Sequence, residues 1–107
     1  MSLEEKVGQL FLVRFNKEVE KQIKDNYPGG YVLYACDFED KTKEEVTKKL
    51  QSLQDESKYP LVFAVDEEGG TVTRVSRYKA FRNEKFKSPQ ELYHEGGYEL
   101  LEKTEKE

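Results

Sequence analysis

The sequence predicts an α/β fold in which parallel strands alternate with helices. The clearest observation is an apolar run over residues 61–65 that ends in three carboxylates and two glycines. A continuous apolar run of this length is typical of a strand buried on both faces, as in a parallel sheet covered by helices. The second observation is the order helix, strand, helix, strand, helix, strand, long loop, helix. This alternation implies crossover connections and parallel pairing.

The first third of the chain holds two helices and two strands. Ser2 and Glu5 form a capping-box pattern that opens the first helix. Val19 and Ile23, four residues apart, mark one face of the second helix. The expected elements are a helix over 2–8, a strand over 10–15, a helix over 18–26 and a strand over 31–35.

The rest of the chain carries two further helix starts. Thr42 and Glu45 form a second capping box, followed by apolar residues at helical spacing. Ser88 followed by Pro89 is typical of an N-cap and the first helical position. The expected elements are a helix over 43–56, a strand over 61–65, a short extended piece around Val72 and Val75, and a helix from 89 that is interrupted at Gly96 and Gly97 and resumes at Tyr98.

Composition excludes several classes of protein. The chain has 107 residues and a net charge of −4, from 22 acidic and 18 basic side chains that are mixed along the sequence. This is at most one domain, and we expect a single partial domain over 1–107. No basic face for nucleic acid is evident. No apolar segment approaches the roughly 20 residues of a membrane span, and the acidic N-terminus is unlike a secretion signal, so we expect a cytoplasmic location.

Two chemically versatile residues are expected to be structural. Cys36 is the only cysteine and His94 the only histidine, so neither an intrachain disulfide nor a zinc cluster can be built from them. We expect no metal site and no cofactor.

The carboxylates after the third strand are the best candidate site. Asp66, Glu67 and Glu68 lie where open α/β sheets and barrels place their ligands. On an extended chain, Glu67 points away from the side shared by Asp66 and Glu68. The cluster also fits a divalent cation, although an exposed acidic turn is the simpler interpretation. Asp66 and Glu68 are too close along one strand to lie on opposite sides of a substrate as a catalytic pair.

Further segments over residues 2–11, 29–34, 50–54 and 86–89 accompany the strand-end motif over 60–70. Together they resemble the N-terminal, catalytic-barrel domain of glycoside hydrolase family three, with the bacterial β-N-acetylglucosaminidase branch the closest. Residues 2–11 are similar to its opening, 29–34 to its second-strand entry and 50–54 to its crossover helix. Residues 60–70 resemble its Val-Asp-x-Glu-Gly-Gly signature, and 86–89 its Phe-Pro-Ser-Pro segment.

The resemblance implies a retaining hydrolase that releases terminal β-linked N-acetylglucosamine from cell-wall or chitin-type oligosaccharides. It implies that the strands and helices are the first units of an α/β barrel and that Asp66 hydrogen-bonds sugar hydroxyls. An ionised carboxylate suits that contact, because each of its two oxygens accepts hydrogen bonds. In the family, the nucleophile, a Lys-His pair and the acid/base loop follow later strands. We therefore expect this chain to be an N-terminal portion without catalytic residues and without glycosidase activity of its own.

The sequence also departs from the family pattern. Thr71 and Thr73 stand where Arg and Gln are usual, and only Arg74 is retained in that stretch. Arg14 stands where Gly is more usual, in the first strand. An alternative is therefore a non-catalytic α/β module that binds carbohydrate or completes its sheet with another copy. Three parallel strands leave two open edges, so we expect self-association.

Overall fold

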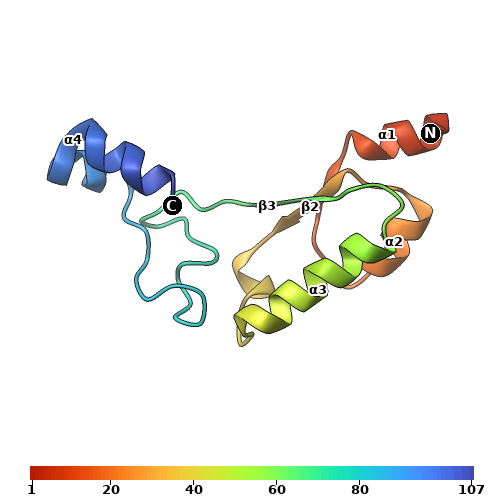
Figure 1. Ribbon diagram of the computed structural model, residues 1–107, viewed down its shortest axis with the longest axis horizontal. Helices are drawn as coiled ribbons and strands as arrows, with labels where there is room; N and C mark the ends of the chain where they lie inside the picture. The colour runs from red at the N-terminus through yellow and green to blue at the C-terminus, as the bar shows by residue number, and fades with distance from the viewer. The chain divides into compact units, whose positions relative to one another are not determined.

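The computed structural model describes residues 1–107 (Figure 1). Three strands pair in parallel in the order β1-β2-β3. The strands are β1 (Leu12–Arg14), β2 (Gly30–Leu33) and β3 (Val62–Val65). Tyr31 of the central strand lies opposite Val13 on one side and opposite Phe63 on the other. The α/β class with parallel strands, predicted from the sequence, is confirmed.

The chain forms two compact units, Met1–Val65 and Asp66–Glu107. The first unit holds the sheet and four helical segments: α1 (Leu3–Gln9), α2 (Val19–Asp25), the 3₁₀ helix η1 (Ala35–Asp37) and α3 (Lys43–Glu56). The second unit holds a long loop and α4 (Pro89–Glu105). None of these helices combines the length and the apolar character that crossing a membrane requires.

Helices α2 and α3 cover one face of the sheet and bury the core of the first unit. Val19 and Ile23 of α2 and Leu53 of α3 pack with Tyr31 and Leu61, and all five are buried. The spacing of Val19 and Ile23 predicted this face correctly. Tyr31 is fully buried, and its hydroxyl donates to the Val19 carbonyl at 3.4 Å. Burial raises the pKa of the Tyr31 hydroxyl, so it stays protonated and able to donate.

The opposite face of the sheet is largely uncovered within the first unit. Leu12 and Val62 flank the central strand on this face and are 52% and 58% exposed. The expectation that the third strand is buried on both faces is therefore wrong for this structure. β3 is an edge strand, so one of its edges is unpaired. Only the face that carries Phe63 packs against the core.

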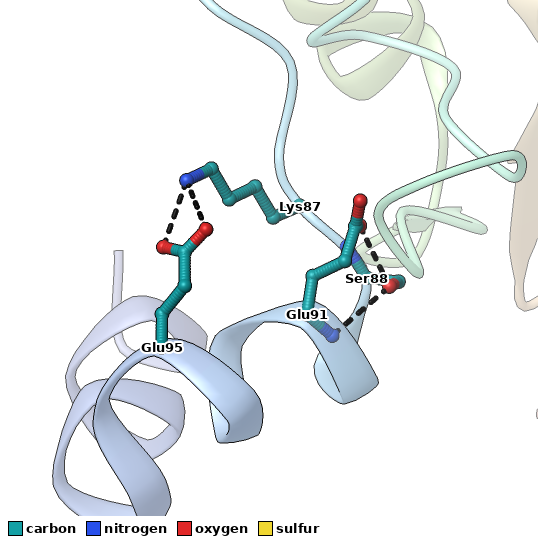
Figure 2. Close-up of polar contacts among 4 residues, drawn as sticks. All are labelled: Lys87, Ser88, Glu91 and Glu95. Carbon is teal, nitrogen blue, oxygen red and sulfur yellow. Dashed lines mark hydrogen bonds and ion pairs between the residues drawn. The ribbon is translucent and has the colours of Figure 1, made fainter.

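Both expected capping boxes are present, and the predicted N-cap Ser88 forms a third one with Glu91. Ser2 with Glu5, Thr42 with Glu45, and Ser88 with Glu91 each exchange reciprocal hydrogen bonds at the start of their helix. At α4 the Ser88 amide donates to the Glu91 carboxylate at 2.8 Å, and Ser88 Oγ accepts from the Glu91 amide at 3.3 Å (Figure 2). These local patterns placed the helix starts correctly, and α3 spans the expected residues.

The break in α4 also lies where the sequence places it. Gly97 has φ 64° and ψ −155°, a conformation essentially limited to glycine. Gly96 departs from helical geometry as well, with φ −149° and ψ 16°. The helix therefore consists of two helical stretches joined at this glycine pair.

All three strands are shorter than the sequence suggests, β3 by a single residue. β1 begins at Leu12, because the amides of Leu10 and Phe11 donate to the last carbonyls of α1, at 3.1 Å each. β2 ends at Leu33, because the chain turns into η1 where the Asp37 carboxylate accepts the Tyr34 amide at 2.7 Å. Residues with high β-propensity near a strand end thus leave the strand when their amides form local hydrogen bonds, which propensity scales do not include.

Candidate functional site

Strand β3 delivers Asp66 at its C-terminal end. This is the end of a parallel strand where open α/β sheets bind ligands. The Asp66 side chain is exposed and has no hydrogen-bond or ion-pair partner within the protein. It does not accept the amides of Glu68 or Gly69, as a turn-capping aspartate would. Its carboxylate is thus available to solvent or to a ligand.

Glu67 is instead tied to the loop that follows. Its Oε2 accepts the backbone amides of Arg74 at 3.0 Å and Val75 at 2.7 Å, and its Oε1 accepts the Ser76 hydroxyl. Burial by itself would raise the pKa of Glu67, but the hydrogen bonds from Ser76, Val75 and Arg74 together lower it. The carboxylate therefore stays ionised while it holds the 74–76 segment close to Glu67.

A second connection joins this loop to the segment before α4. Ser76 is 3% exposed, and its hydroxyl oxygen accepts the Phe86 amide at 3.3 Å while the hydroxyl donates to Glu67. The Gly70 amide donates to the Phe86 carbonyl at 2.9 Å. Glu67 and Gly70 of the signature loop, residues 66–72, thus form hydrogen bonds with residues that come seven to sixteen positions later.

The two glycines allow that close approach. Gly69 and Gly70 have φ values of 80° and 59°, in the left-handed region that glycine adopts readily. A Cβ on Gly69 would lie 2.2 Å from the Lys87 carbonyl oxygen, and one on Gly70 2.9 Å from Ser88 Cβ. Any larger residue here would push the signature loop off the 86–88 segment.

The three carboxylates do not converge on a common point. Glu67 faces its amide donors, whereas the Glu68 side chain is exposed and the Glu68 amide donates to the Val72 carbonyl at 3.0 Å. No group of three or more His, Cys, Asp or Glu is placed to hold a metal ion. The divalent-cation interpretation of this cluster therefore gains no support from the structure.

The other residues singled out in the sequence lie away from this loop. Cys36 is an exposed free thiol, with the Arg14 guanidinium 3.7 Å from its sulfur. The Arg14 guanidinium also stacks over the Tyr34 ring, 4.5 Å from its centroid. His94 is exposed on α4 beside Tyr93, their ring centroids 6.4 Å apart. Val72 forms an isolated bridge with Gly69, but the extended piece expected at Val75 is absent.

The sequence assigned no role to Glu67. In the structure, its carboxylate accepts the three hydrogen bonds that hold the 74–76 segment in place. The alternation of side chains along a strand placed it opposite Asp66, but nothing in the spacing identified its donors. Thr73 and Ser76, both buried, were missed in the same way. Thr73 Oγ1 has no hydrogen-bond partner.

A family model described as the glycosyl hydrolase family 3 N terminal domain matches residues 2–85. The match spans well over half of the chain and includes the whole sheet, Asp66, Gly69 and Gly70. The chain belongs to glycosyl hydrolase family 3. No curated protein and no solved structure matches the chain.

Membership of family 3 identifies the chain with a family of glycosidases. The signature loop is part of the family domain, since residues 65–70 fall inside the matched range. Helix α4 begins at Pro89, beyond that range. The family match therefore does not include the 86–88 segment, which packs against Gly69 and Gly70.

Proposed function

We propose that this chain is the part of a β-N-acetylglucosaminidase that carries a contact to the terminal sugar, made by Asp66. The observation that carries the proposal is the pairing of a family 3 match with an exposed, unpartnered carboxylate at the end of β3. A free carboxylate accepts hydrogen bonds from two neighbouring sugar hydroxyls without losing any contact inside the protein.

The different contacts of Asp66 and Glu67 support this role. Glu67 fixes the loop through amides and a hydroxyl, so Asp66 is not needed to stabilise the turn. The side chain therefore remains free for substrate. We further propose that the α/β units belong to a barrel whose sugar pocket this loop helps to form, as in the family.

The test is the substitution Asp66→Ala in the active glycosidase that carries this domain. We expect kcat/KM for a chromogenic N-acetylglucosaminide to fall by about ten- to a hundredfold, because a charge-assisted hydrogen bond to substrate contributes on the order of 1.5 to 3 kcal/mol. The melting temperature should stay close to that of the wild type. Glu68→Gln is the control, since it removes an exposed neighbouring charge outside the proposed contact.

A different result would reassign the residue. If Asp66→Ala melts several degrees lower yet keeps near-normal kcat/KM below its melting temperature, Asp66 is a structural residue. Parallel assays with a β-glucoside and a β-xyloside test the sugar itself. Faster turnover of either one than of the N-acetylglucosaminide would contradict the proposed substrate while leaving the family unchanged.

A further inference from the structure

An open groove of about 730 Å³ lies within the second unit, between the signature loop and α4. Its walls are mainly apolar and are formed by Val72, Phe86, Pro89, Leu92 and Leu101. The volume falls within the range of roughly 300–1,000 Å³ that is typical of ligand pockets. Asp66, the residue of the proposed sugar contact, is not among the residues that line the groove.

The rim of the groove is negatively charged. Four glutamates line it, and two of them are already engaged. Glu67 is held by loop amides, and Glu107 pairs with Arg82 at 2.6 Å. Glu68 and Glu105 are exposed and have no ion-pair partner. Two uncompensated carboxylates thus stand at the edge of an apolar surface.

The single cation in the lining does not neutralise them. Lys87 donates to both carboxylate oxygens of Glu95, at 2.6 and 2.8 Å (Figure 2). This pairing raises the pKa of Lys87, which keeps the lysine charged and directed at Glu95. A ligand that complements the groove must therefore bring positive charge of its own.

The geometry points to a docking site for a short basic segment of a partner polypeptide, with an aliphatic side chain as its anchor. The anchor fills the apolar floor, and flanking lysines or arginines pair with Glu68 and Glu105. The walls favour such a peptide over a sugar, because sugars need convergent polar groups or open aromatic faces. Phe86, the one aromatic residue in the lining, has the Arg82 guanidinium 3.9 Å from its ring centroid.

The probe is a fluorescent heptapeptide of alternating lysine and leucine, titrated into the full chain and followed by anisotropy. We expect saturable binding that weakens as salt rises from 50 to 500 mM, since exposed charge pairs are screened. Glu68→Gln combined with Glu105→Gln should weaken binding about fivefold, the factor that two rim ion pairs of about 0.5 kcal/mol each would produce. Glu99→Gln, an exposed α4 carboxylate outside the lining, should leave binding unchanged.

Several outcomes would overturn the proposal. Equal binding of a matched peptide with glutamate in place of lysine would show that charge plays no part. Binding of a glucosamine trisaccharide without binding of the lysine peptide would assign the groove to a cationic sugar. An unchanged affinity in the double variant, with its circular dichroism spectrum intact, would place the peptide elsewhere. No glycosidase activity enters the measurement, so the result is independent of the function proposed above.

Discussion

Asp66 and Glu67 are adjacent carboxylates with opposite surroundings. Asp66 is exposed and unpartnered, whereas Glu67 accepts two amides and a hydroxyl from the 74–76 segment. Side chains alternate along the chain as it leaves β3, so one carboxylate turns toward the loop and the other away from it. At the scale of single residues, the site therefore separates a structural acid from a candidate ligand.

This separation makes a stability prediction for Glu67. We expect Glu67→Gln to lower the free energy of unfolding by about 1 to 2 kcal/mol, because hydrogen bonds to an ionised acceptor are stronger than those to a neutral one. Urea denaturation followed by circular dichroism measures the change. Glu68→Gln is the matched control and should shift the free energy by less than about 0.5 kcal/mol. Equal effects of the two substitutions would contradict the role given to Glu67.

At the scale of elements, an ion pair connects α1 to the loop that precedes β3. Glu5 is buried at the start of α1 and accepts from the Lys58 ammonium and from the Ser2 amide, both at 2.6 Å. These two contacts lower the pKa of Glu5 from 4.5 to about 2, and the hydrogen bond from Lys58 has the larger effect. The short helix is thus fixed by one side chain that also completes its capping box.

The lowered pKa of Glu5 predicts how stability depends on pH. A carboxyl group whose pKa is lower in the folded protein stabilises it fully above the unfolded pKa, and that contribution is lost as pH falls. We expect the free energy of unfolding to decrease between about pH 5 and pH 2, and Glu5→Gln to reduce this decrease. Urea denaturation at pH 6, 4 and 3 measures it.

The control for Glu5 is Glu4→Gln. Glu4 lies in the same helical turn and carries the same charge, but it has no ion pair. We expect this variant to keep the pH dependence of the wild type. If the two variants have the same pH profile, the Glu5–Lys58 pair does not cause the acid sensitivity.

At the scale of the whole molecule, the main feature is the uncovered face of the sheet in the first unit. Leu10 and Phe11 precede β1 and are 83% and 59% exposed, and Leu12 and Val62 on the uncovered face are more than half exposed. Both β1 and β3 have a free edge. Apolar side chains beside unpaired strand edges are the usual template for pairing with another chain.

We therefore expect the chain to self-associate as its concentration rises. Static light scattering over a concentration series should show an increasing average mass. Val62→Lys should reduce the increase, because a charge on an edge strand opposes pairing. Thr47→Lys, an exposed position on α3, adds the same charge away from the sheet and should have little effect. A constant monomer mass at millimolar concentration would contradict this expectation.

The sequence by itself determined the local features of this protein. Capping boxes at Ser2, Thr42 and Ser88 and the glycine pair in α4 involve residues within a few positions of one another, so their patterns are readable along the chain. The alternation of elements predicted parallel pairing, and the strand-end signature identified the family. These features survive in the structure because short-range hydrogen bonds and backbone limits do not depend on what packs around them.

Only the tertiary structure decided which surfaces are covered and which of the neighbouring carboxylates, Asp66 or Glu67, has a structural role. The apolar run of β3 reads as fully buried, yet its burial depends on neighbours that a linear pattern does not specify, and here β3 has one neighbour. Glu67 meets donors seven to nine residues away because the loop folds back, an arrangement set by Gly69 and Gly70 packing against the 86–88 segment. Burial and partner choice arise from contacts between distant parts of the chain, and those contacts exist only once it has folded.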